Sequence, residues 1–147
     1  KLCQKIGLTD RQATLHGSFT PVIRKPVFRL PCGKSILGLG DSVILNDPIG
    51  GQGANIACQA ASFYLEKIKA HQNLLFTETW MHETFELYWQ QIAHWAVQWT
   101  NLLLNPSETL ITLLKVASTQ ANMADQLADG FDNPAKLLST SDHFKLK

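Results

Sequence analysis

The sequence predicts an α+β protein that is mostly helical, with a β-hairpin and a glycine-rich loop followed by four or five helices. Two short apolar runs separated by a turn predict the hairpin, and four glycines gather within residues 40–53. Apolar residues then recur at helical spacing through residues 77–104. The chain has 147 residues, of which 45% are hydrophobic and 17% charged. This composition is typical of a folded protein and excludes a disordered chain or a charge-driven nucleic-acid binder.

The hairpin is predicted from residues 22–30 and 35–39. The first run is rich in Val, Ile and Phe, but Pro26 cannot donate a ladder hydrogen bond, so we expect an edge strand or a bulge there. The second run is apolar without alternation, which is typical of a strand buried on both faces. Residues 31–34 form the turn between the two runs.

The remaining chain is predicted to be helical. Helices are expected to begin around residues 51–54 and end near 71, to cover 77–104 with a wide apolar stripe, to run from 106 to about 117 and from about 120 to 129, and a short one is expected after residue 133.

Local residues predict where the last three helices begin and end. Asn105 is the expected N-cap of the third helix, with Pro106 at its first position and Glu108 completing a capping box. Gly130 is expected just past the end of the fourth helix. Asn133 and the proline after it repeat the N-cap signal for the last one.

Charge and cysteine usage restrict the class of protein. Residues 1–75 carry nine Lys/Arg and four Asp/Glu, whereas residues 76–147 carry four and eight. The three cysteines, Cys3, Cys32 and Cys58, lie far apart, which argues against a disulfide framework or a zinc site and for a reduced, cytoplasmic setting. No apolar run is long enough to predict a membrane span.

The segment most indicative of function runs from residue 36 to residue 55. A strand leads into Gly40-Asp41, and Asp47-Pro48 and a glycine-rich turn then lead into a helix. Open α/β sheets bind ligands at the ends of such strands, and a helix N-terminus offers unpaired N–H groups. A tight turn with no ligand would explain the glycines alone equally well. The two acidic positions, the proline and the Gln/Asn pair favour an anion or cofactor site instead, so such a site is predicted.

The amino-acid sequence of this segment resembles the second flavin-binding motif of FAD-dependent aromatic monooxygenases. The motif is Gly40-Asp41 followed by Asp47-Pro48-x-x-Gly51-Gln52-Gly53-Ala54-Asn55, and it looks most like the styrene/indole monooxygenase branch. Residues 99–101 and 130–135 resemble the helical C-terminus of that branch. The broader hydroxylases often follow Gly-Asp with Ala-Ala-His, where this chain has Ser42-Val43-Ile44.

The resemblance implies roles for individual residues. Asp41 would hydrogen-bond a hydroxyl of FAD, and Pro48 would lie beside the flavin ring where oxygen reacts. Backbone N–H groups after Gly51 would face the pyrimidine end of the ring, where the helix dipole favours negative charge. The implied cofactor-binding residues are Gly40, Asp41, Asp47, Pro48, Gly51, Gln52, Gly53, Ala54 and Asn55, with Pro48 also catalytic.

The resemblance also implies a larger enzyme. The family's G-x-G-x-x-G unit does not occur in this chain, which starts at Lys1 without a Met, so we expect a C-terminal piece of a Rossmann-like FAD-binding protein that is inactive alone. Residues 1–75 would complete the FAD-binding domain, and residues 76–147 would form a helical region packed on it. The implied reaction is epoxidation or hydroxylation of a small aromatic such as styrene or indole with O2. A separate flavin reductase and a second copy of the chain are the implied protein partners.

The sequence is also compatible with two other functions. The aromatic-rich helix over residues 77–104 is also compatible with a non-catalytic interaction module, and an FAD-dependent dehydrogenase or reductase of related fold is a third hypothesis. His82-Glu83 begins like a zinc motif, but Glu86 stands where its second histidine should be, so no metal site is predicted. The basic residues of the first 34 positions are expected to form a solvated face, or else a surface near the FAD phosphates or a reductase.

Overall fold

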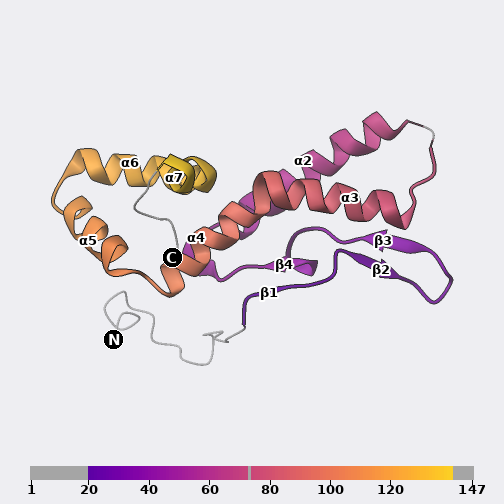
Figure 1. Ribbon diagram of the computed structural model, residues 1–147, viewed down its shortest axis with the longest axis horizontal. Coiled ribbons are helices and arrows are strands. Elements are labelled where there is room, and N and C mark those ends of the chain that lie inside the picture. Colours follow the sequence, from indigo (N-terminus) through magenta and orange to yellow (C-terminus); the bar gives the residue numbers. More distant parts are fainter. Residues whose placement is uncertain (1–19, 73, 141–147) are drawn as a thin grey trace, which may run out of the picture.

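The computed structural model describes residues 20–72 and 74–140. It is mostly helical with two small antiparallel sheets, which confirms the predicted α+β class (Figure 1). The strands lie along one side of two long antiparallel helical segments, and the last three helices gather at one end. Predictions for Cys3 and for residues 1–19 and 141–147 lie outside the described residues.

The two apolar runs form three strands, because the first of them is broken at Pro26. β2 (Val27–Arg29) and β3 (Ser35–Leu37) form the predicted hairpin, with Phe28 opposite Ile36. β1 (Val22–Ile23) instead pairs with β4 (Ile44–Leu45), a strand that the sequence did not predict.

The prediction that residues 35–39 form a strand buried on both faces is wrong. Ile36 is 46% exposed and its cross-strand partner Phe28 is 63% exposed. In a two-stranded sheet, alternate side chains point to opposite faces, and here one face packs on α3 (Glu78–Tyr88) while the other faces outward.

The predicted helix over residues 77–104 is confirmed, with one irregular turn inside it. Thr77 caps the start of α3 by accepting a hydrogen bond from the Trp80 backbone N–H. A π-helical turn, η4 (Trp89–Ala93), follows, and α4 (His94–Leu104) completes the run. Together they lie antiparallel to α2 (Gly53–His71), whose predicted extent is also confirmed (Figure 1).

The last three helices are α5 (Glu108–Ala117), α6 (Ala121–Asp132) and α7 (Pro134–Thr140). Asn133 is confirmed as the N-cap of α7, since its Oδ1 accepts a hydrogen bond from the Lys136 N–H at 3.0 Å.

Two of the predicted helix boundaries are wrong. The N-cap of α5 is Ser107, not Asn105, because its hydroxyl is the group that accepts from the Leu110 N–H. Gly130 lies inside α6 rather than after it. A Cβ at Gly130 would lie 2.8 Å from Leu137 Cδ1 of α7, so the glycine permits these two helices to pack closely.

Buried side chains form two clusters. The first joins β4, α2, α3, η4 and α4, and so draws residues from both sides of position 75. Within it the Tyr88 hydroxyl donates to the Ile56 carbonyl oxygen at 2.7 Å, which satisfies a buried phenol. The second cluster surrounds Trp99 of α4 and Leu110 of α5, and it includes Leu138 of α7. These clusters hold α2 and α4 beneath the glycine-rich segment, which we define as residues 40–55.

Candidate functional site

The glycine-rich segment connects the hairpin to α2 and contains every cofactor-binding residue that the resemblance implies. It consists of a 3-10 turn, η2 (Gly40–Ser42), then β4, then a second turn, η3 (Pro48–Gly50), and the first turn of α2. The fold brings Asp41 to the start of the helix, because its Oδ1 lies 4.0 Å from the position of a Cβ at Gly53. A carboxylate and a helix N-terminus twelve positions apart in sequence are thereby neighbours.

The backbone around Asp41 is fixed from two sides. Arg24 Nη1 donates to the Asp41 carbonyl oxygen at 3.0 Å, and the Arg24 backbone N–H donates to the Val43 carbonyl oxygen at 2.8 Å. On the other side, Gly40 adopts φ +56°, and a Cβ there would lie 3.1 Å from Ala57 Cβ on α2. The left-handed φ and the close approach both favour glycine at this position.

The Asp41 side chain itself is exposed, and among the described residues no group donates a hydrogen bond to its carboxylate. It therefore keeps its full accepting capacity for a ligand beside the first turn of α2.

Asp47 has a structural role in the second turn. Its Oδ1 accepts a hydrogen bond from the Ile49 N–H at 2.9 Å, which makes it the N-cap of η3 with Pro48 at the first position. Gly51 ends the turn at φ +62°, and a Cβ there would meet only open space. Pro48, Ile49 and Gly51 are exposed, so the backbone of this turn can be approached from outside.

Two residues of the segment are turned inward. Gly50 is buried against α4, and a Cβ on it would lie 2.7 Å from Thr100 Oγ1. Gln52 is 4% exposed, and its Nε2 donates to the Phe131 carbonyl oxygen at 2.6 Å. The Gln52 side chain therefore anchors the segment to α6, and only its backbone remains for a ligand.

The first turn of α2 presents donors to the outside. Gln52 stands at the N-cap position without forming a side-chain cap, and Ala54 and Asn55 are exposed. The initial N–H groups of a helix have no partner inside it and carry partial positive charge. Together with the Asp41 carboxylate, to which no described residue donates a hydrogen bond, they place hydrogen-bond donors beside an acceptor at the start of α2.

The shifted ionisable groups lie in the core rather than at this segment. Burial raises the pKa of the Tyr64 phenol to about 12, and burial with the neighbouring Tyr64 charge raises the pKa of Tyr88 further. Both phenols are neutral donors near pH 7. Within residues 20–72 and 74–140, no cluster of three or more His, Cys, Asp or Glu side chains could hold a metal ion. None of the helices in that part is long and apolar enough to cross a membrane.

Three contributors to this site were missed by the sequence analysis. They are Arg24, which fixes the backbone at Asp41, and Thr100 and Phe131, which fix the segment from α4 and α6. Each acts across a long sequence separation through a backbone group or a close contact. No periodicity or spacing in the chain signals such contacts.

Two known proteins that resemble this chain in sequence are both styrene monooxygenases. No family model matches the chain. It is 35% identical over 128 residues to a styrene monooxygenase of Pseudomonas fluorescens, and equally so to one from a Pseudomonas species. The alignment covers 83% of this chain but 30% of each relative, so the chain spans about 30% of the length of the curated relatives it matches. The chain is therefore styrene monooxygenase-like over most of its length.

Proposed function

We propose that the complete protein containing this chain is a flavin-dependent monooxygenase and that residues 40–55 form part of its FAD site. The observation that carries the proposal is the position of the Asp41 carboxylate, to which no described residue donates a hydrogen bond, beside the start of α2, which has no side-chain cap. The identity to styrene monooxygenases over 128 residues supports the same assignment.

The described residues fit a flavin in chemical type. Asp41 would accept a hydrogen bond from a ribityl or ribose hydroxyl. The N–H groups of Gly53, Ala54 and Asn55 would donate to the electron-rich pyrimidine edge of the ring, and their partial positive charge would favour a negatively charged reduced flavin there. Because a Cβ at Gly51 would meet only open space and Pro48 is exposed, the turn leaves room for a ring against its backbone. Gly40 and Asp47 would act through the backbone conformation that they maintain.

Bound reduced FAD would supply the electrons for reaction with O2 and the transfer of one oxygen atom to the substrate. Pro48, at the exposed side of the turn, would help exclude water from the face of the ring. We further propose a small aromatic substrate such as styrene or indole, flavin reduction by a separate reductase, and a cytoplasmic location. A homodimer is part of the same hypothesis. The 147-residue chain alone is expected to be inactive.

The experiment uses the complete protein. FAD is titrated into the apoprotein, and reduced FAD, air and styrene or indole are then supplied, with product analysed by chromatography. FAD binding together with an oxygenated product supports the proposal, and the absence of both refutes it. Adding NADH with and without a flavin reductase tests the partner, since NADH oxidation by the protein alone would indicate a dehydrogenase or reductase instead.

A further inference from the structure

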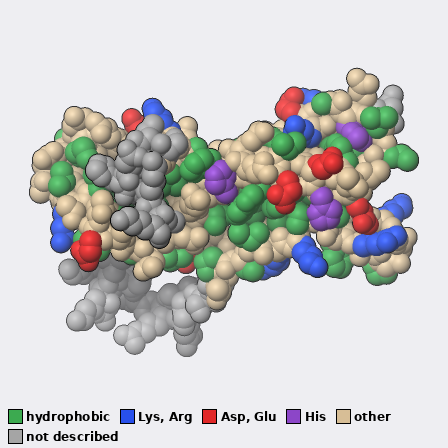
Figure 2. Space-filling view, in the orientation of Figure 1, with side chains coloured by type: hydrophobic (Ala, Val, Ile, Leu, Met, Phe, Trp, Pro, Cys, Tyr) green, Lys and Arg blue, Asp and Glu red, His purple; other side chains and the backbone are tan. Residues whose placement is uncertain are grey.

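A groove of about 830 Å³ lies away from the glycine-rich segment. It runs between the hairpin β2–β3, the C-terminal half of α2 and the start of α3, and no residue of the 40–55 segment lines it. Its volume lies within the range of small-molecule sites in proteins. At the end of the molecule that holds the hairpin β2–β3, on the right in Figure 2, charged side chains of both signs are interspersed with exposed hydrophobic ones.

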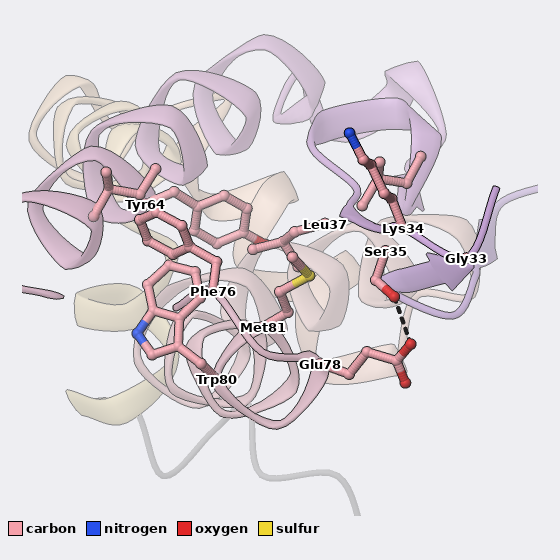
Figure 3. Close-up of a pocket in the computed structure, with 11 residues that line it drawn as sticks. Gly33, Lys34, Ser35, Leu37, Tyr64, Phe76, Glu78, Trp80 and Met81 are labelled. Atoms are coloured by element: carbon pink, nitrogen blue, oxygen red, sulfur yellow. Dashed lines mark hydrogen bonds between the residues drawn. The ribbon is translucent and has the colours of Figure 1, made fainter. Parts of the chain in front are cut away.

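One end of the groove is aromatic. Tyr64, Phe76 and Trp80 gather there, with Met81 and Leu37 toward the middle (Figure 3). The Phe76 and Trp80 ring centroids are 4.9 Å apart at an angle of 65°, and Phe76 is 46% exposed. The exposed part of Phe76 offers apolar surface on which a further ring can pack. This end is therefore suited to a flat apolar group.

The other end of the groove holds a hydrogen-bond acceptor. The Ser35 hydroxyl donates to Glu78 Oε1 (Figure 3). Arg29 Nε lies 3.9 Å from the same oxygen. A carboxylate has about four acceptor positions, so Glu78 can accept a further hydrogen bond. The Lys34 amino group points away from the Ser35–Glu78 pair. The acceptor therefore favours an O–H or N–H donor and disfavours an anion.

From these two ends we propose that the groove binds a flat, neutral aromatic molecule that carries one O–H or N–H group. The ring lies against Tyr64, Phe76 and Trp80, and the donor reaches Glu78. This site is separate from the proposed FAD site and does not rest on it.

The test is a titration of the complete protein with 1-naphthol, naphthalene and 1-naphthoate, followed by tryptophan fluorescence and thermal shift. We expect 1-naphthol to bind more tightly than naphthalene, which lacks the donor, and than 1-naphthoate, whose carboxylate would meet that of Glu78. An order with 1-naphthoate tightest, or no binding of 1-naphthol, would overturn the proposal. No binding of 1-naphthol is the result expected if another part of the complete protein covers the groove.

Two pairs of variants place the bound molecule in the groove. Ile68→Trp fills the groove from an exposed position of α2, and Leu65→Trp makes the same change outside it. We expect Ile68→Trp to weaken 1-naphthol binding about tenfold or more, because it occupies the space of the ligand, and Leu65→Trp to leave binding unchanged. Equal effects of both variants would contradict the assignment.

Glu78→Gln tests the acceptor, with Glu83→Gln on the exposed side of the same helix as its control. We expect Glu78→Gln to weaken 1-naphthol about three- to tenfold, which is modest because Glu78 is half exposed, and to leave naphthalene unchanged. Saturating FAD should not displace 1-naphthol. Displacement by FAD, or indifference to both Ile68→Trp and Glu78→Gln, would show that 1-naphthol binds elsewhere. Circular dichroism of each variant verifies that it is folded.

Discussion

The side-chain amide of Gln52 donates a hydrogen bond to the backbone carbonyl oxygen of Phe131, 2.6 Å away and 79 positions later in the chain. Gln52 lies within the glycine-rich segment at the N-cap position of α2, and Phe131 lies in α6, where its ring meets that of Trp99 edge to face. One buried side chain therefore connects the proposed cofactor site to the C-terminal helices.

Removing this connection should destabilise the protein. Gln52→Ala leaves the Phe131 carbonyl without its donor in a partly buried place, so we expect a loss of about 1–3 kcal/mol in the free energy of unfolding. Urea denaturation followed by tryptophan fluorescence measures it. Gln59→Ala, at an exposed position of the same helix, is the control and should change stability by less than about 0.5 kcal/mol. Equal stabilities of the two variants would contradict an anchoring role for Gln52.

Asp41→Ala should weaken FAD binding to the complete protein. The variant lacks the carboxylate that would accept a charge-assisted hydrogen bond from a flavin hydroxyl. We therefore expect its binding free energy for FAD to be weaker by about 1–3 kcal/mol. Fluorescence titration with FAD measures the change. Asp129→Ala removes an exposed carboxylate from α6 and serves as the control. An unchanged FAD affinity for Asp41→Ala would refute the proposed role of this residue.

A side chain at position 50 should conflict with Thr100. The Cβ of Gly50→Ala would lie 2.7 Å from Thr100 Oγ1, so we expect a destabilisation of about 1–3 kcal/mol from overpacking. Thr100→Ala removes that oxygen, and the double variant should recover part of the loss. A double-mutant cycle of unfolding free energies measures the coupling. Additive effects would show that the two residues do not limit each other.

Burial of the two core tyrosines predicts alkaline instability. The folded-state pKa of Tyr64 is raised from 10.0 to about 12, so above pH 10 the unfolded chain loses this proton while the folded chain keeps it. The stabilisation is complete below pH 10 and is lost as the pH rises toward 12. Thermal unfolding between pH 8.5 and 12 measures the loss, and Tyr64→Phe should flatten the profile. An identical pH dependence of the variant and the wild type would contradict the raised pKa.

The sequence could predict the helices and the glycine-rich segment because their signals are local. Apolar spacing predicts the extents of α2 and of the run from α3 to α4, and the cap at Asn133 involves a residue only three positions away. The predicted N-cap at Asn105 was wrong because Ser107, which is also a residue type common at N-caps, is the one whose hydroxyl accepts a hydrogen bond from a backbone N–H of α5. The motif in residues 40–55 likewise predicted a resemblance that the styrene monooxygenase relatives support.

The sequence by itself thus determined the helical segments, the turns and the motif of residues 40–55. Each of these depends on residues within a few positions of one another. Only the tertiary structure decided that β1 pairs with β4, that Ile36 is exposed, and that Gln52 points inward to Phe131. These outcomes depend on which distant surfaces meet, and packing between distant segments is set by the whole fold rather than by local preference. That packing also brings the Asp41 carboxylate to the start of α2, where the proposed cofactor would bind.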